Sequence, residues 1–243
     1  MFIFPGVSSG SAAYLIEQSL LFNDDDSAYL SRTPSVAGNR KEWTFSAWVK
    51  PSDTSSNHVI FSTSTDANNR SQLLFSSGKL QFTNVSSGSV ICQKETTALF
   101  RDASAWYSIT LVCSTTDSTA EDRLKLYING VRITSFGTNT NFSLNADAEI
   151  NSITTHEIGR RTQSSIIYYS GLIALPQLID GAALSATDFG ETDDNGFWNP
   201  IEFTGTTTTD LIPSSTGTAE DTGTTSFGYA GRVIANAFND VTV

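Results

Sequence analysis

The sequence predicts an all-β protein built as a single antiparallel two-sheet sandwich, and three observations support this. Ser and Thr together make up about a quarter of the 243 residues, well above their usual share, which disfavours a helical bundle. Hydrophobic and polar residues alternate with a period of two along much of the chain. Gly, Asn, Asp and Ser repeatedly interrupt the alternation, as turns between short strands do. Sandwiches of about 200–250 residues commonly form one domain, so the length fits one unit.

Residues 43–50 are the first strand whose faces can be assigned. Pro51 ends the strand, because proline cannot donate a hydrogen bond to a neighbouring strand. Residues 106–113 follow the same alternation later in the chain. The side chains that we expect to face the core are Trp43, Phe45, Ala47 and Val49 from the first strand, and Tyr107, Ile109, Leu111 and Cys113 from the second.

Two hairpins are predicted by turn chemistry and hydrophobic pattern together. In residues 73–82, a two-residue Ser77-Gly78 loop pairs Phe75 with Leu80 and Leu73 with Phe82, so that four apolar side chains share one face. In residues 124–133, Asn129-Gly130 is typical of a type I′ turn. That turn pairs Ile128 with Val131 and Leu126 with Ile133. The agreement of two independent signals indicates that both hairpins form.

The C-terminal third is less regular. Residues 171–179 are apolar at both parities, as in a strand covered on both faces, and Pro176 favours an edge strand or a bulge there. Residues 182–189 predict one or two helical turns, and residues 204–226 predict a loop, linker or weakly packed extension. We therefore expect a leader at residues 1–17, a sandwich at 18–190 and a Thr/Gly-rich extension at 191–243.

Composition excludes several classes of partner. The net charge of −11 and the pI near 4.5 disfavour binding to nucleic acid or to an anionic membrane surface. No apolar run approaches the ~20 residues of a membrane span. Cys92 and Cys113 are too few for a disulfide framework, so we expect two buried thiols, with a single disulfide between neighbouring strands as the alternative. We expect His58 and His156 in loops or at the surface, since neither lies in a zinc-ligand spacing.

Several stretches, taken in order, carry a resemblance to a known family. The sequence of residues 18–30, 43–50, 106–112 and 124–131 resembles the concanavalin A-like lectin/glucanase superfamily. More narrowly, it is similar to the laminin G-like jelly rolls in virion proteins of marine tailed bacteriophages, as are residues 179–191 and 197–205. The resemblance implies an antiparallel jelly roll that binds ligands on its concave sheet or rim loops. A strand that often carries an acidic residue in such domains reads Ile173-Ala174-Leu175-Pro176 here.

The sequence contains no recognisable catalytic or metal site. Retaining glucanases on such jelly rolls need two carboxylates on one strand face, as in Glu-x-Asp-x-Glu, and this spacing is missing. We therefore expect no catalytic residue and no enzyme activity. Calcium is conceivable at Asp24-Asp25-Asp26 or at Asp193-Asp194-Asn195, but both stretches also read as polar turns and neither has a calcium-loop spacing. We expect no cofactor.

Two pairs of adjacent aromatic residues are the candidates for sugar recognition. Tyr168-Tyr169 and Phe197-Trp198 could stack on a pyranose ring. Neighbouring residues of a strand point to opposite faces, so one member of each pair is expected to face the core. Trp43, Trp48 and Trp106 lie on predicted strands and are expected to serve packing.

The expected function is a non-enzymatic virion structural protein. It would decorate the capsid or tail of a bacteriophage particle as an adhesion module, in several copies, after assembly in the host cytoplasm. The leader 1–17 and the extension would dock onto other virion subunits. The alternative is a carbohydrate-binding receptor module of a tail fibre, with a host-surface glycan as its partner.

Overall fold

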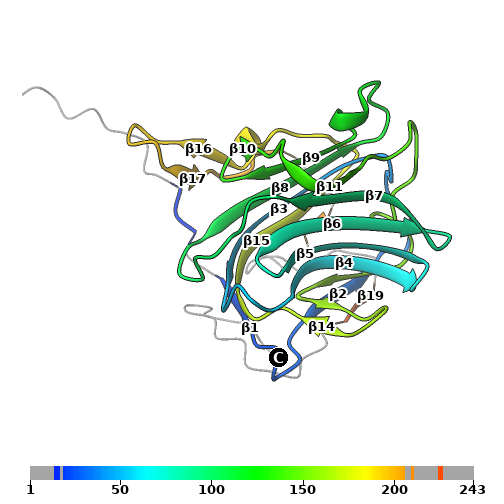
Figure 1. The fold of residues 1–243 in the computed structure, drawn as a ribbon, viewed down its shortest axis with the longest axis horizontal. Helices are drawn as coiled ribbons and strands as arrows, with labels where there is room; N and C mark the ends of the chain where they lie inside the picture. Colours follow the sequence, from blue (N-terminus) through cyan, green and yellow to red (C-terminus); the bar gives the residue numbers. More distant parts are fainter. Residues whose placement is uncertain (1–13, 17–18, 206–208, 211–223, 227–243) are drawn as a thin grey trace, which may run out of the picture.

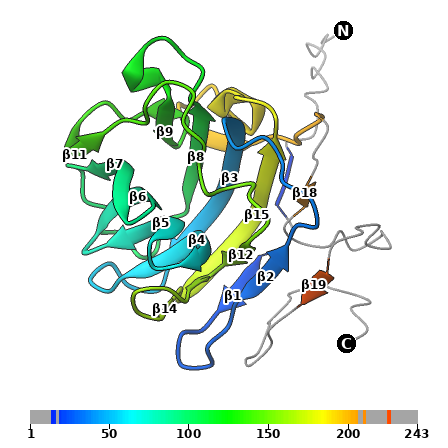
Figure 2. The same ribbon diagram turned by 90° about the vertical axis from the view of Figure 1, so that its right-hand side faces the viewer.

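The computed structural model describes residues 14–16, 19–205, 209–210 and 224–226. Two antiparallel sheets pack face to face over one hydrophobic core, and Figure 2 shows them as two layers. The predicted all-β jelly-roll sandwich is confirmed. In the described part of the chain, no helix is long and apolar enough to cross a membrane.

The first layer is a seven-stranded sheet that brings distant parts of the chain together (Figure 1). Its central strand β3 pairs with β8 on one side and with β15 on the other. In spatial order the strands are β1 (Leu20–Phe22), β15 (Gly171–Asp180), β3 (Glu42–Pro51), β8 (Tyr107–Ser114), β9 (Leu124–Ile128) and β10 (Val131–Arg132), and β18 (Thr209–Asp210) also pairs with β15.

The second layer is an eight-stranded sheet, four of whose strands follow one another in sequence as hairpins. These four are β4 to β7, and β11 and β12 flank them. In spatial order the strands are β11 (Phe136–Thr140), β7 (Ser89–Thr96), β6 (Lys79–Ser86), β5 (Asn69–Ser76), β4 (His58–Asp66), β12 (Thr155–Ile158), β2 (Leu30–Thr33) and β19 (Thr224–Ser226).

Two short hairpins and two 3₁₀ turns complete the described structure. β13 (Arg160–Arg161) pairs with β14 (Ile167–Tyr168), and β16 (Gly190–Thr192) pairs with β17 (Trp198–Pro200). The 3₁₀ turns are η1 (Ala120–Asp122) and η2 (Ala186–Asp188). The helical signal at residues 182–189 thus corresponds to one short turn, which Ser185 and Asp188 cap reciprocally.

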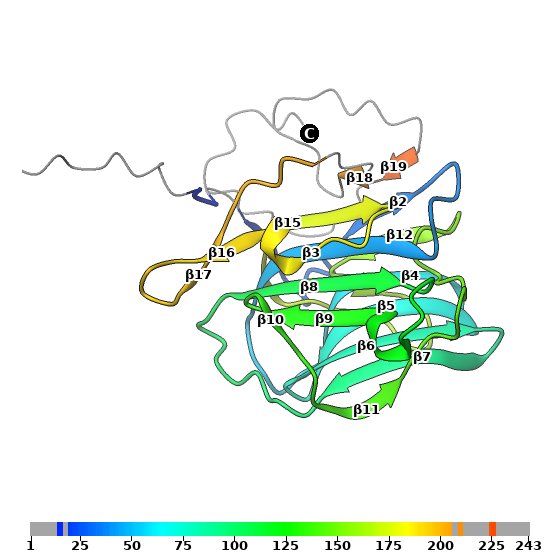
Figure 3. The same cartoon turned by 90° about the horizontal axis from the view of Figure 1, so that it is seen from above.

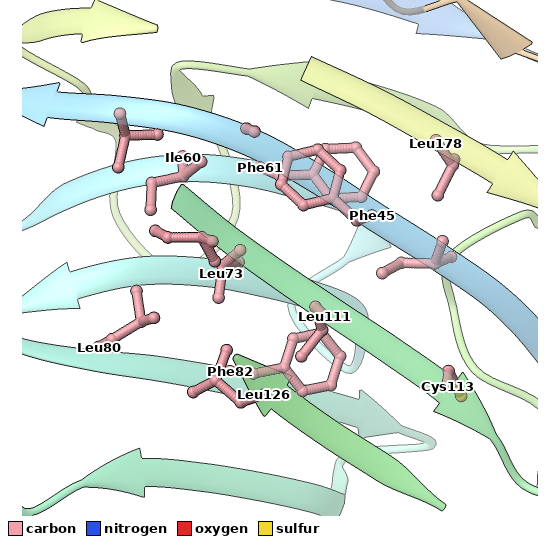
Figure 4. Close-up of a cluster of buried hydrophobic side chains, with 14 of the residues drawn as sticks. Phe45, Ile60, Phe61, Leu73, Leu80, Phe82, Leu111, Cys113, Leu126 and Leu178 are labelled. Atoms are coloured by element: carbon pink, nitrogen blue, oxygen red, sulfur yellow. The ribbon is translucent and has the colours of Figure 1, made fainter. Parts of the chain in front are cut away.

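The core lies between the two sheets and is rich in aromatic side chains (Figure 4). Phe45 of β3 and Phe61 of β4 stack across the layers with their ring centroids 4.7 Å apart. Trp43, Phe45, Ala47 and Val49 are all fully buried, as their alternation predicts. Ile109, Leu111 and Cys113 belong to the same cluster, and Tyr107 packs at its margin.

Both predicted hairpins have the predicted register. Leu73 pairs with Phe82 and Phe75 with Leu80 across Ser77-Gly78, both of whose φ angles are positive. Asn129 and Gly130 have φ of 47° and 75°, as a type I′ turn requires, and Val131 pairs with Ile128. Val131 is nevertheless 67% exposed, although the side chain of Ile128 opposite it is buried in the core.

The two alternatives for Pro176 are resolved in favour of a bulge. β15 lies between β1 and β3, so it is not an edge strand, and its pairing with β3 shifts register between Ala174 and Gln177. Leu175 has φ of +46° at this point, a conformation that costs free energy for a branched side chain. The extra residue leaves room for a proline within a paired strand.

The predicted positions of the histidines are wrong. His58 lies on β4 opposite Phe75 and His156 lies on β12 opposite Thr63, and both side chains face inward and are buried. Each is tolerated in the interior because its ring nitrogens have polar neighbours. The Ser170 N–H donates to His58 Nδ1, and the Asn151 N–H donates to His156 Nε2.

The two cysteines are buried free thiols, as expected. Burial raises the pKa of Cys92 to about 12, so the reactive thiolate is disfavoured. Of the regions predicted at the termini, residues 1–13, 17–18, 206–208, 211–223 and 227–243 lie outside the described residues. The boundaries at 18 and 190 stay a prediction.

Candidate functional site

Tyr169 is a core residue and is not available to a ligand. Its ring is fully buried, edge-on to Phe22 at 6.1 Å and to His58 at 5.7 Å between centroids. Its hydroxyl donates to the Leu172 carbonyl oxygen, and burial raises its pKa. The expectation that Tyr169 contacts sugar is therefore corrected, because the strand alternation that frees its neighbour turns this ring inward. Tyr168 is half-buried on β14.

The second aromatic pair lies at the other end of the molecule (Figure 1). Phe197 is 68% exposed at the turn of the β16–β17 hairpin. Trp198 is half-buried, and its ring lies against Gly130 and Gly190, where a Cβ atom would come within 2.5 Å of the ring. Figure 3 shows this hairpin beside β10 at the end of the seven-stranded sheet. Trp198 thus anchors the hairpin, and the two predicted pairs do not form one site.

The acidic stretches considered for calcium are turns in the structure. The amide of Asn23 donates to Asp26, and the Ser27 N–H donates to the Asp24 carbonyl oxygen. Asp193 accepts hydrogen bonds from the backbone N–H groups of Phe197 and Asn195, which lower the pKa of its carboxyl group. Within the described ranges, no three His, Cys, Asp or Glu side chains converge as metal ligands.

A polar surface that the sequence analysis did not identify lies on the outer face of the eight-stranded sheet. Gln72, Thr83 and Gln93 are direct cross-strand partners on β5, β6 and β7. Their neighbours Leu73, Phe82 and Lys94 face inward and are fully buried, so these three side chains point away from the core. Gln72 and Thr83 are nevertheless buried, whereas Gln93 is partly exposed. Gln81 and Glu95 form the next row of the same face. We call these five residues, Gln72, Gln81, Thr83, Gln93 and Glu95, the polar face.

Hydrogen bonds within the polar face fix one of its rows. Glu95 accepts from Lys79 Nζ and from Gln81 Nε2, each at 2.9 Å. The Thr83 hydroxyl donates to Gln81 Oε1 at 3.4 Å. Gln93 is half-exposed, and its amide makes no hydrogen bond to another described side chain. The face therefore presents a fixed carboxylate and a free amide.

The β13–β14 hairpin borders the polar face. The Ser62 hydroxyl of β4 donates to the Arg160 carbonyl oxygen at 2.6 Å, which ties the hairpin to the outer side of the sheet. The Arg160 guanidinium pairs with Glu157 and lies over the Tyr29 ring, 3.2 Å from its centroid. The next residue, Arg161, donates from Nη1 to Gln72 Oε1 at 2.8 Å. The hairpin thus adds a guanidinium to the row of amides.

A sequence signal for this surface exists. On β5 and β6, the residues of the polar face lie at the parity opposite to the core residues Leu73 and Phe82, although the apolar Leu74 shares the parity of Gln72. Glutamine at that parity in each of three neighbouring strands, rather than Ser or Thr, is the feature that a search for aromatic pairs overlooked.

Comparison with known proteins identifies the fold family. The chain aligns with the solved structure of a heptameric SAP-like pentraxin from Limulus polyphemus over 72% of this chain and 80% of that chain, with 20% identity and a TM-score of 0.51. The chain is also similar to domains LG4–5 of the mouse laminin α1 chain, with 12% identity over 72% of this chain and 44% of that chain and a TM-score of 0.46. A putative carbohydrate-binding protein from Bacteroides ovatus aligns with 14% identity over 70% of this chain and 45% of that chain, with a TM-score of 0.46.

A search of curated proteins finds no match to this chain. A sequence model of the Laminin_G_3 family, described as the concanavalin A-like lectin/glucanases superfamily, matches residues 22–188, which is more than half of the chain. This protein therefore belongs to the concanavalin A-like lectin/glucanases superfamily.

Proposed function

We propose that this protein is a non-enzymatic carbohydrate-binding module and that the polar face is its glycan-contacting surface. The observation that carries the proposal is the group of partly exposed long polar side chains Gln81, Gln93 and Glu95, next to the buried Gln72–Thr83 pair, on the outside of a rigid sheet. Polar groups held on strands keep their positions before a ligand arrives, which reduces the entropy lost on binding.

The chemistry of the polar face suits sugar hydroxyl groups. Each hydroxyl both donates and accepts a hydrogen bond. A glutamine amide offers two donors and an acceptor, a threonine hydroxyl offers both roles, and an ionised glutamate offers acceptors alone. Gln93 and Glu95 lie on β7 with both roles between them, and Gln81 lies beside them on β6, so a saccharide lying across these two strands would find partners on both.

The positions of the carboxylates argue against glycoside hydrolysis on this face. Glu95 is on β7 and Glu157 is on β12, four strand positions away. At ~4.8 Å per strand they are about 19 Å apart, whereas retaining and inverting enzymes need about 5 to 10 Å. Each is also held by a cation, Glu95 by Lys79 and Glu157 by Arg160. These two acids are therefore assigned to structure and binding.

A glycan array followed by titration calorimetry tests the proposal. The wild-type protein should bind at least one glycan, and Gln93→Ala and Gln81→Ala should each weaken that binding. Gln177→Ala is the matched control, because it removes the same amide from the outer face of the seven-stranded sheet. Equal weakening by the control, or no binding to any glycan on the array, would overturn the proposal.

We further propose that the module is a structural component of a bacteriophage particle, where several copies are attached to capsid or tail subunits. The support is the likeness of residues 18–30, 179–191 and 197–205 to phage virion domains. Attachment would use residues 1–17 and 191–243, and the polar face would remain open to a host-surface glycan. Electron microscopy of labelled particles should place the chain on the capsid or tail surface, and deletion of residues 206–243 should release it. Particles without the chain would refute this assignment.

A further inference from the structure

Two arginines lie side by side at the end of the polar face. Arg70 and Gln72 are alternate residues of β5, so their side chains point to the same side of the sheet, about 7 Å apart along the strand. Arg161 reaches Gln72 from the β13–β14 hairpin through its Nη1–Oε1 hydrogen bond of 2.8 Å. Gln72 therefore contacts one guanidinium group, and a second, from a separate part of the chain, lies on the same side of the sheet.

Arg161 is positioned without a counter-charge. Nε donates to the Ser165 carbonyl oxygen, Nη2 donates to the Ser165 hydroxyl, and Nη1 donates to Gln72. A guanidinium has five N–H groups, so two remain available. All three acceptors are neutral, and no carboxylate in the described part of the chain forms an ion pair with it. Its neighbour Arg160, in contrast, is neutralised by Glu157.

Arg70 also lacks a counter-charge among the described residues. Its Nη1 donates to the Ala67 carbonyl oxygen, and its Nε is enclosed without an acceptor. The carboxylate nearest in sequence, Asp66, instead accepts from the backbone N–H groups of Asn68 and Asn69. The guanidinium thus keeps donors that no acceptor among the described residues satisfies.

The two cations influence each other. Burial and, secondarily, the charge of Arg70 lower the pKa of Arg161. Like charges held near each other in a partly desolvated site repel, and an anion placed between them relieves that repulsion. A guanidinium suits this task because its planar fork donates two parallel hydrogen bonds to one oxyanion.

We propose that Arg70 and Arg161 form a subsite for an anionic substituent, a carboxylate or a sulfate ester, of an acidic glycan whose neutral hydroxyl groups lie along the polar face. The inference rests on the proposed function and specifies its ligand class. The net charge of −11 opposes the binding of acidic polymers to the rest of the surface. A chain of that charge repels acidic polymers in general, so attraction requires a local site of positive potential.

Three polysaccharides test the inference by calorimetry with the full chain. Polygalacturonate carries carboxylates, dextran sulfate carries sulfate esters, and dextran is the neutral reference. We expect at least one of the two anionic polymers to bind more tightly than dextran. Arg161→Gln and Arg70→Gln should each weaken that binding about tenfold to a hundredfold, the usual scale for a charge-assisted hydrogen bond. Preference for one anionic polymer identifies the substituent.

Arg101→Gln is the matched control, because it removes the same charge from an exposed loop residue. Thermal unfolding of each variant verifies that it folds. If Arg161→Gln does not fold, Arg70→Gln still tests the subsite independently. If acidic polymers bind no better than dextran, or if Arg101→Gln weakens binding as much as the other two variants, the inference is wrong while glycan binding stands. If neutral glycans on the array and all three polymers fail to bind, the proposed function itself is wrong.

Discussion

The outer faces of the two sheets differ in what covers them. On the seven-stranded sheet, Thr44, Val112 and Ile179 point away from the core and are still buried. The Thr44 hydroxyl donates to the Ala182 carbonyl oxygen and accepts from the Leu184 N–H, both at 2.9 Å. The segment after β15 therefore folds back onto this face. On the eight-stranded sheet, outward positions such as Leu74 and Thr83 are also buried, but Gln81, Gln93 and Glu95 on β6 and β7 are partly exposed long polar side chains.

This difference separates a packing surface from the proposed binding surface. A face that the chain itself covers needs small or apolar side chains and satisfied hydroxyl groups, as Ser46 and Thr110 illustrate by facing each other at 3.5 Å. Long amide and carboxylate side chains lose entropy when hydrogen bonds hold them in one conformation, as they hold Gln81 and Glu95. Under the proposed function, their concentration on one face serves a ligand rather than the fold.

The largest expected effect comes from the core that both faces share. Phe45→Ala removes the ring that stacks on Phe61 between the sheets, and we expect it to lower the free energy of unfolding by about 3–5 kcal/mol. Urea unfolding followed by tryptophan fluorescence measures the change. A loss below about 1 kcal/mol would show that the two sheets do not depend on this contact.

The second effect is a pH dependence of stability that comes from His156 on the inner face of the eight-stranded sheet. Burial lowers the pKa of His156 to about 4, below the ~6.5 of an unfolded histidine. The unfolded chain therefore takes up the proton first. Above pH ~6.5 the histidine is neutral in both states and the free energy of unfolding has its full value. As the pH falls from ~6.5 through about 4, the free energy of unfolding declines by roughly 3 kcal/mol in total.

His156→Gln isolates that contribution. The variant should lose less stability than the wild type between pH 6.5 and 4.5, because glutamine does not titrate. Urea unfolding at several pH values gives both curves. Parallel curves would contradict the assignment to His156.

The third effect concerns the covered face. Thr44→Val keeps the shape of the side chain and removes the hydroxyl that serves Ala182 and Leu184. Two backbone groups lose a partner, so we expect a loss of about 1–3 kcal/mol. Ser64→Ala, a small polar residue on the outer face of the other sheet, is the control and should change stability by less than ~0.5 kcal/mol. Equal losses for both variants would remove the distinction between the faces.

The smallest effect on stability is expected where the effect on binding is greatest. Gln93→Ala should change the free energy of unfolding by no more than about 0.5 kcal/mol, because its amide makes no hydrogen bond to another described side chain. Chemical unfolding checks this. Strong destabilisation would show that the polar face serves the fold instead of a ligand.

The sandwich could be predicted from the sequence because its signals are local. Asn129-Gly130 and Ser77-Gly78 set the hairpin registers, and the alternation in β3 separates the buried from the outward positions. Pro176 predicted either an edge strand or a bulge, and the structure has the bulge at Leu175. These features depend on residues that are neighbours in the chain, so no knowledge of the tertiary structure was needed.

The histidines and the candidate site depend on contacts between distant segments. His156 is buried because β12 pairs with β4, almost 100 residues earlier in the chain. The subsite needs Arg161 to reach Gln72, 89 residues away. The aromatic pairs were chosen for their residue type alone. In the structure Tyr169 is buried in the core, and the Trp198 ring packs against Gly130 and Gly190. Strand order, which no local pattern encodes, decides which polar side chains meet.

Chemical-shift mapping by NMR tests the central claim most directly. The side-chain amides of Gln72, Gln81 and Gln93 give separate signals, and Gln177 reports on the opposite face of the sandwich. On titration with a glycan selected from the array, the three amides of the polar face should shift together while Gln177 stays unchanged. Shifts confined to Gln177 or to the Trp198 indole, with the polar face silent, would contradict the account.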